Sequence, residues 1–396
     1  MRKGFLSILL DIITKPKYNR SVFIGRSLAM LKTKGIHHLS STVGHAQRNV
    51  DFYASVLGLR LVKQTLNYDD KDTYHLYYGN HEASTNLITT FPWVDGRPGE
   101  IKGGQVTVAS YAIKPDTMNF WRDRLHQFGI KTYEFTAFNK KRLGFNDPDG
   151  LELELLEVAG APENSWTYNG INQQQTIAGI DRAILTSTDP QETLKVLTEV
   201  LGYELKDEDE ESYLLKIHDH LGGHLELSKH ATQRGKMGVG VVHHIAFIVD
   251  DEDIEGWRAQ LKQAGLSPTE IKNRKYFKSI YFREKGGILI ELATQGPGMG
   301  VDEPLENLGK QLIIPDHYKD EAQDIVDELM PITVREVSKL EGYGYRNRTE
   351  YESLKRKDEI KAKIRELKKK ETLTLEDQKQ IDQLKKQYLK QGANHE

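Results

Sequence analysis

The chain has 396 residues, a formal net charge of −3 and no cysteine. This length is enough for two or three domains with a sizeable core, and the small net charge gives no reason to expect a nucleic acid partner. The lack of cysteine excludes disulfides, thiolate metal sites and cysteine nucleophiles, so any metal must be held by histidine and carboxylate, and a cytoplasmic location is favoured.

Residues 1–34 are predicted to be an N-terminal extension. The first twenty residues begin with basic side chains and continue into a short apolar run that Asp11 interrupts. This run is too short to span a bilayer, and no cleavage site of small residues follows it. We therefore predict neither a signal peptide nor a membrane partner, and Met30 is an alternative start of the chain.

From residue 35 the chain repeats one order of elements four times. Residues 35–93 contain a strand ("HHLSSTV"), a helix ("AQRNVDFYASVLG") and three more strands, and the same order returns in 104–158, 179–229 and 240–295. Period-two alternation predicts the strands, and apolar residues three and four apart predict the helices. Each βαβββ unit is too small to bury its own sheet. The sequence therefore predicts an α+β fold in which four units pair into curved, barrel-like mixed sheets with helices outside.

The boundaries between these repeats predict the domain organisation. We expect a first domain of two units at residues 35–160, a second domain of two units at 178–296, a C-terminal arm at 297–334 and a charged extension at 335–396.

The charged extension has the pattern of a helical hairpin over 355–391. Its apolar residues are spaced for one face of each of two helices: Ile360, Ile364 and Leu367, then Ile381, Leu384 and Tyr388. The sequence "TLED" at 374–377 fits a capping box between the helices. A solvated tail is favoured over a docking or oligomerisation element, and the interleaved lysines and acids do not support nucleic-acid binding.

Two histidine pairs begin the first strands of units one and four, in "GIHHLSSTVG" at 35–44 and "VVHHIAFIVD" at 241–250. Because successive side chains on a strand point to opposite faces, His38 and His244 each share a face with small neighbours. In "GGILIELAT", the last strand of unit four, Glu291 lies among apolar residues, where a buried charge needs a partner. His38, His244 and Glu291 are predicted to converge on one cavity, and this ligand set is associated with non-haem Fe(II) oxygenases.

Two alternatives to this site remain open at this stage. Glu154 follows Gly150 by four residues, as Glu291 follows Gly287. With Glu154 as a fourth ligand, the centre would suit a metal-dependent isomerase or lyase using Ni, Zn or Mn. However, the alternation in "LELELLE" is typical of a solvated strand face. Without a metal, the same fold would bind planar aromatic or drug molecules.

The chain also resembles a known family. It is similar to the hydroquinone-type ring-cleaving dioxygenases of the vicinal oxygen chelate superfamily, which includes glyoxalase I, extradiol dioxygenases and bleomycin-resistance proteins. The resemblance covers residues 35 to about 330 and is carried by "GIHHLSSTVGHAQRNVDFYASVLGLRLVKQTLNYDD", "YHLYYG", "TTFPW", "HHIAF" and "RKYFKSIYFREKGGILIELAT".

This resemblance implies that His38, His244 and Glu291 ligate Fe(II), with Mn(II) as the second choice. It also places His37, Arg274 and Tyr281 in the substrate pocket. Strict alternation turns His37 away from the face of His38, so the strand would have to twist or bulge there.

The implied reaction is extradiol-type cleavage of a hydroquinone or catechol-like ring, with quinone detoxification as a family-level expectation. Arg274 or Tyr281 would hold the second hydroxyl group. His37, or His243 if it faces the pocket, would move a proton. The expected partners are a small aromatic substrate and O2, and a homo-oligomer is left open.

Overall fold

The structure is a computed structural model that describes residues 30–83, 85–338, 348–370 and 372–390. The predictions about the apolar run and a signal peptide concern residues outside these ranges. Within the described ranges, no helix is both long enough and apolar enough to cross a membrane.

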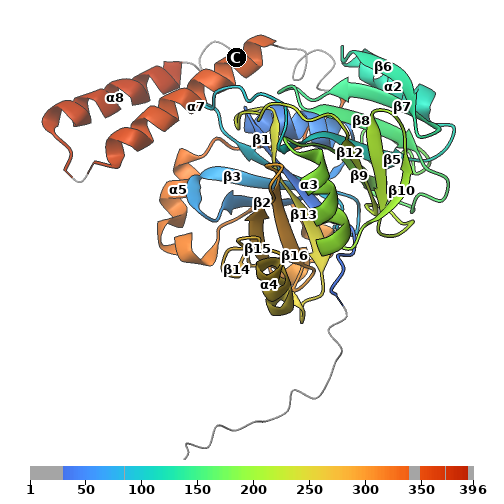
Figure 1. Cartoon of the computed structure of the whole chain (residues 1–396). Coiled ribbons are helices and arrows are strands. Elements are labelled where there is room, and N and C mark those ends of the chain that lie inside the picture. The colour runs from blue at the N-terminus through green and yellow to red at the C-terminus, as the bar shows by residue number, and fades with distance from the viewer. Residues whose placement is uncertain (1–29, 84, 339–347, 371, 391–396) are drawn as a thin grey trace, which may run out of the picture. The chain divides into compact units, whose positions relative to one another are not determined.

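Two curved mixed sheets make up most of the fold (Figure 1). One sheet has nine strands in the order β14-β15-β16-β13-β1-β4-β3-β2-β17, and the other has eight in the order β10-β11-β12-β9-β5-β8-β7-β6. The strands are β1 (Ile36–Val43), β2 (Arg60–Asn67), β3 (Asp70–Gly79), β4 (Leu87–Pro92), β5 (Gln105–Ile113), β6 (Thr132–Ala137), β7 (Lys140–Asn146), β8 (Glu152–Glu157), β9 (Gly179–Thr186), β10 (Glu204–Glu208), β11 (Ser212–Lys216), β12 (His224–Ser228), β13 (Val241–Val249), β14 (Lys272–Asn273), β15 (Lys278–Arg283), β16 (Leu289–Thr294) and β17 (Leu312–Ile313).

The helices are few and short, apart from the last two. They are α1 (Ala46–Val50), which continues into the π-helical η1 (Asp51–Val56), α2 (Met118–Gln127), α3 (Pro190–Lys195), which continues into the π-helical η2 (Val196–Val200), α4 (Ile254–Gln263), η3 (Met299–Val301), η4 (Leu305–Asn307), η5 (Asp316–Glu321), α5 (Ala322–Glu328), α7 (Arg348–Lys368) and α8 (Leu375–Lys390). The predicted α+β class with paired βαβββ units and a C-terminal helical hairpin is confirmed.

Each sheet joins one unit from each half of the chain. Strand β1 of unit one runs antiparallel to β13 of unit four, and β5 of unit two runs antiparallel to β9 of unit three. The predicted domains 35–160 and 178–296 stay a prediction. Each of the two sheets contains strands from both segments. This pairing brings the two histidine pairs, 206 residues apart in sequence, onto neighbouring strands.

One predicted strand is mostly absent. The sequence "LSPTEIK" at 266–272 suggests a strand, but only Lys272–Asn273 pairs with β15, as β14. Pro268 lacks the N–H that a sheet ladder requires, so before Lys272 the contact with β15 is reduced to hydrogen bonds between Thr269 and Tyr281.

Glycines with positive φ begin the last strand of units two and four. Gly150 and Gly287 have φ of 100° and 98°, a region that only glycine adopts readily. A Cβ on Gly287 would lie 3.1 Å from the Cα of Gly104, so the two backbones can approach this closely only without side chains. The same turn therefore places Glu154 and Glu291 at matching positions in the two sheets.

The C-terminal hairpin is built as its pattern predicts. Ile360, Ile364, Ile381 and Leu384 form a small separate core between α7 and α8. The capping box is present, because the amide of Asp377 donates to Thr374 Oγ1 over 3.1 Å and the amide of Thr374 donates to Asp377 Oδ2 over 3.0 Å.

Candidate metal centre

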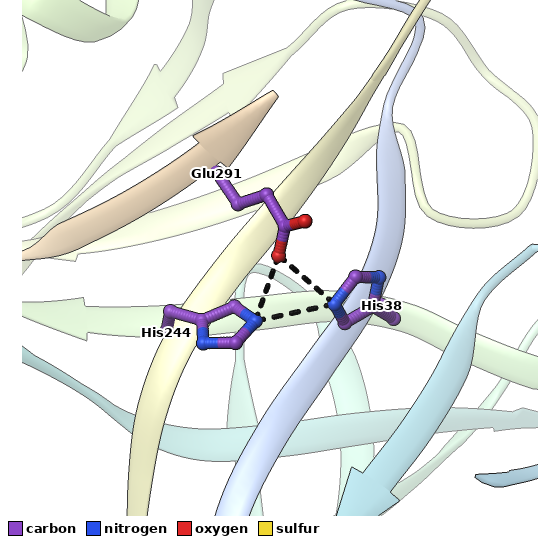
Figure 2. Close-up of side chains that lie close together, drawn as sticks. All are labelled: His38, His244 and Glu291. Carbon is purple, nitrogen blue, oxygen red and sulfur yellow. Dashed lines mark hydrogen bonds and ion pairs between the residues drawn. The ribbon is translucent and has the colours of Figure 1, made fainter. Parts of the chain in front are cut away.

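Three buried side chains from three adjacent strands meet at one point (Figure 2). His38 on β1 and His244 on β13 bring their Nε2 atoms within 3.2 Å of each other. Oε2 of Glu291 on β16 lies 3.2 Å from His38 Nε2 and 2.8 Å from His244 Nε2. The structure therefore brings together the three residues that strand alternation selected, and their ligating atoms all lie within 4.8 Å of one another.

Each of these histidines is oriented by the histidine that precedes it. Nδ1 of His38 lies 2.8 Å from Nδ1 of His37, and Nδ1 of His244 lies 2.9 Å from Nδ1 of His243. His37 also donates a hydrogen bond to the backbone carbonyl of Thr294. A neutral His37 that donates from Nε2 accepts a hydrogen bond at Nδ1 from Nδ1 of His38. His38 then carries its proton on Nδ1 and turns the lone pair of Nε2 toward the centre, which is the tautomer that a metal ligand requires.

The ionisation of the site suits a cation. Burial lowers the pKa of His244 despite the nearby Glu291. Burial alone would raise the pKa of Glu291, but the two imidazoles outweigh it and hold this pKa well below its usual range. Oε2 of Glu291 faces both imidazole Nε2 atoms, and the Tyr281 hydroxyl also interacts with this carboxylate. A carboxylate oxygen and two imidazole lone pairs that face one another repel, and a divalent cation would remove that repulsion.

His37 lies behind His38. The register of β1 against β13 shifts between Ile36 and His38, so the irregularity that the pocket assignment of His37 required is present. His37 is nonetheless buried against Phe277, with ring centroids 5.0 Å apart, and it does not line the cavity. Burial and the neighbouring His38 lower its pKa to about 3, so its imidazole is neutral near pH 7.

A cavity of about 340 Å³ opens onto the metal ligands. His243, Arg274 and Tyr281 all line it, together with His38 and His244. His243 was predicted on the helix-covered face unless it turned to the pocket, and the structure leaves it exposed on the cavity wall. Burial lowers the pKa of His243 to about 4, and burial raises the pKa of Tyr281, with the charge of Glu291 adding to the rise.

Arg274 stands at the mouth of the cavity. Its Nη1 and Nη2 atoms each lie 3.2 Å from Asp69 Oδ2. Its guanidinium carbon lies 5.6 Å from the ring centroid of Tyr281 and 6.0 Å from that of Tyr68. The ion pair with Asp69 and the rings of Tyr68 and Tyr281 thus hold the positive charge of Arg274 beside the cavity.

Several cavity residues were missed from the sequence, most of them aromatic. They are Tyr68, Asp69, His75, Tyr77, Phe91, Trp93 and Phe277. His75 is held on both ring nitrogens, by Thr89 Oγ1 at 3.0 Å and by the Tyr77 hydroxyl at 3.0 Å, and its ring stacks on Phe91. The alternation in "TYHLYYG" places His75 and Tyr77 on one face, so strand parity could have found this pair.

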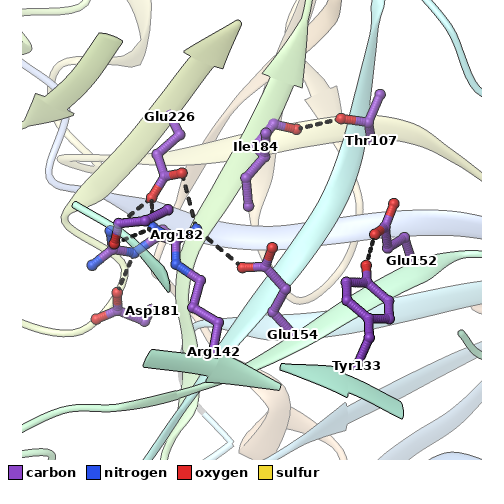
Figure 3. A network of polar contacts seen from close by, with 10 residues as sticks. Thr107, Tyr133, Arg142, Glu152, Glu154, Asp181, Arg182, Ile184 and Glu226 are labelled. Carbon is purple, nitrogen blue, oxygen red and sulfur yellow. Dashed lines mark hydrogen bonds and ion pairs between the residues drawn. The ribbon is translucent and has the colours of Figure 1, made fainter. Parts of the chain in front are cut away.

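Glu154 is not part of this centre (Figure 3). It lies in the eight-stranded sheet, where its Oε2 is 3.2 Å from Arg142 Nη1. Arg142 also binds Glu226, and Arg182 joins that carboxylate to Asp181. In the eight-stranded sheet, the guanidinium groups of Arg142 and Arg182 therefore form ion pairs with the buried carboxylates. In the nine-stranded sheet, two histidines face Glu291 instead. The expectation of a solvated face at Glu154 is wrong, because the residue is buried.

The arrangement has definite chemical uses. A two-histidine, one-carboxylate set occupies one face of an octahedral ion and leaves the other positions for exchangeable ligands. The aromatic lining suits a flat ring, and Arg274, Tyr281 and His243 supply polar groups within the same cavity.

Comparison with known protein families gives a match over both halves of the repeat region. The profile of the Glyoxalase/Bleomycin resistance protein/Dioxygenase superfamily matches residues 35–155 and 179–292. These two spans contain all three candidate ligands.

Individual relatives match over nearly their whole length. The chain is 41% identical over 308 residues to the "Putative ring-cleaving dioxygenase MhqO" of Bacillus subtilis, which covers 77% of this chain and 99% of that protein. It is 29% identical over 315 residues to the "Chlorohydroquinone/hydroquinone 1,2-dioxygenase" of Sphingobium indicum, which covers 76% and 95%. A solved structure described as a "putative dioxygenase" from Bacillus subtilis matches with a TM-score of 0.76 and 40% identity, over 77% of this chain and 99% of that one.

Proposed function

Because the chain belongs to the Glyoxalase/Bleomycin resistance protein/Dioxygenase superfamily, we propose that it is an Fe(II)-dependent, extradiol-type dioxygenase that cleaves hydroquinone or catechol-like rings. The observation that carries this proposal is the buried set of His38, His244 and Glu291 at the base of an aromatic cavity. The printed names of the relatives support ring cleavage and a hydroquinone substrate.

His38, His244 and Glu291 would hold the metal, and Fe(II) is preferred to Mn(II) because this ligand set is typical of non-haem iron oxygenases. A bound Fe(II) would supply adjacent positions for a substrate oxygen and for O2. His37 and His243 keep the two imidazoles in the required tautomer through their Nδ1 contacts. In this proposal His37 is a positioning residue, since it lies behind His38 and outside the cavity lining.

The cavity residues would bind and orient the ring. Phe277 and Phe91 offer apolar faces within the lining, and they exclude water from the ring. Arg274 and Tyr281 would hold the hydroxyl group that a 1,4-hydroquinone cannot direct to the metal. His243 lines the cavity, and because its Nδ1 faces Nδ1 of His244 its own proton lies on Nε2, from which it would donate a hydrogen bond to an oxygen of the bound ring.

The expected product is a ring-opened semialdehyde or an acylated unsaturated acid. Clearance of quinols that arise during quinone stress would be the corresponding biological use.

Oxygen uptake tests the proposal directly. The purified protein would be loaded anaerobically with Fe(II) and mixed with methylhydroquinone, chlorohydroquinone or catechol. We expect O2 consumption that matches substrate loss and a new ring-opened chromophore, both absent in His244→Ala. If stoichiometric iron is bound and no O2 is consumed with any substrate, the dioxygenase proposal is wrong. Methylglyoxal with a thiol would then test the isomerase alternative.

A further inference from the structure

The C-terminal hairpin of α7 and α8 lies outside the family match, which ends at residue 292. Its contacts with the rest of the chain show where it would act.

Helix α7 is attached to the fold by polar contacts on one side. Nζ of Lys361 donates to the carbonyl of Asp327, and Lys368 pairs with Glu328 over 2.5 Å, at the end of α5. Nearer the start of α7, Asp358 lies 3.0 Å from Nε2 of His45, the residue that caps α1.

A second group of contacts reaches the substrate side. Asp72 on β3 forms ion pairs with two cations of the hairpin: Nε of Arg365 in α7 lies 3.9 Å from its Oδ2, and Nζ of Lys369, the residue that directly follows α7, lies 3.2 Å from it. The Asp72 side chain is only 16% exposed. The strand segment that carries it begins at the β2–β3 turn, Asn67–Asp70, whose residues line the cavity mouth.

That turn connects α7 with Arg274. Asp69 pairs with Arg274, and Tyr68 lies under the same guanidinium. The amide of Asp72 donates to Asp70 Oδ1 over 3.1 Å, which makes Asp69–Asp72 one local unit. A second hollow of about 220 Å³ lies between α7 and β3, and it shares Asp70, Thr73 and Trp93 with the substrate cavity.

We propose that α7 and the residue that follows it position one wall of the substrate cavity: Arg365 and Lys369 hold Asp72, and thereby hold the β2–β3 turn that presents Tyr68 and Asp69 to Arg274. The idea rests on the proposed function, since it assigns the hairpin to the affinity of that site for its aromatic substrate. Asp72 is thus a positioning residue that touches neither metal nor substrate.

The size of the effect is bounded by other contacts on the turn. The carbonyl of Tyr68 accepts hydrogen bonds from His317 Nε2 and the Tyr318 hydroxyl, and Lys71 pairs with Glu321. Partly exposed ion pairs contribute modestly, so removing those to Asp72 loosens the turn without releasing it. We expect the KM for the ring substrate to rise about threefold to tenfold, with kcat changed less than about twofold.

The test uses full-length Asp72→Asn, Lys369→Gln and the double variant. Lys363→Gln is the matched control, since Lys363 is an exposed lysine in α7 with no ion pair among the described residues. Both single variants should raise KM at unchanged iron content, and Asp72→Glu should raise it less than Asp72→Asn does. The double variant should have the KM of Asp72→Asn, because that substitution already removes the contact with Lys369. Additive effects, or a KM equal to that of wild type, would overturn the proposal.

Hydrogen exchange separates this proposal from the dioxygenase assignment. Amides of residues 68–73 should exchange faster in both single variants and at the wild-type rate in Lys363→Gln. Calorimetric binding of chlorohydroquinone under anaerobic conditions should weaken in parallel. If wild type consumes no O2 but these two shifts occur, only the reaction is misassigned. Unchanged exchange and binding in an active enzyme would show that the hairpin does not position this wall of the cavity.

Discussion

Replacing Glu291 by Gln is the sharpest test of the metal centre. The substitution keeps the shape of the side chain and removes the only negative charge among the three candidate ligands. Glu154→Gln is the matched control, because Glu154 follows the same positive-φ glycine turn in the other sheet but pairs with Arg142.

The magnitude follows from the size of the site. At an effective dielectric constant of about 20, unit charges about 4 Å apart interact by about 4 kcal/mol, and a dication doubles this. The ligand atoms lie within 4.8 Å of one another. Part of this lost attraction is offset, because the amide oxygen of Gln can still bind the metal and costs less to remove from water than a carboxylate does. We therefore expect the metal dissociation constant of Glu291→Gln to rise at least about 100-fold, or about 2.7 kcal/mol.

The Glu154→Gln control should keep its metal affinity and lose stability. Glu154→Gln removes one contact of Arg142, which still makes two hydrogen bonds to Glu226 at 3.0 and 2.6 Å. Its metal affinity should equal that of wild type, while its unfolding free energy falls by about 1–2 kcal/mol. Chelator competition gives the metal affinity and urea unfolding gives the stability. If Glu291→Gln binds metal within about threefold of wild type, Glu291 is not a ligand.

Three further results are expected. Burial, aided by Asp149, raises the pKa of Asp147 to about 7. The contribution of Asp147 to the unfolding free energy is thus fully present below about pH 4 and is lost as pH rises through about 7, at about 1.4 kcal/mol per pH unit. Asp147→Asn should make the unfolding free energy less dependent on pH, as measured by urea unfolding at pH 5 and pH 7. Arg142→Met leaves two buried carboxylates without this partner and should cost about 3–5 kcal/mol of unfolding free energy at pH 7, where Lys141→Met costs almost nothing. Tyr281→Phe should retain full iron content but lower kcat/KM for hydroquinones about tenfold to a hundredfold, and an unchanged kcat/KM would remove Tyr281 from the proposed mechanism.

The sequence by itself determined the repeat and its chemistry. The period-two strands and the order of elements predicted four βαβββ units, since each unit needs a partner to bury its sheet. Strand parity selected His38, His244 and Glu291, because which face a side chain takes depends only on the local backbone. The spacing of Ile360, Ile364, Ile381 and Leu384 predicted the helical hairpin for the same reason.

The tertiary structure decided what depends on contacts distant in sequence. The pairing of β1 with β13 and β5 with β9 is set by how the sheets curve around a common core, which no single unit encodes. Glu154 and Glu291 have equivalent local sequences, and only the neighbour across the sheet, Arg142 in one case and two histidines in the other, separates an ion pair from a candidate metal ligand. The contact of Lys369 with Asp72 likewise joins charges nearly 300 residues apart, which local periodicity cannot register.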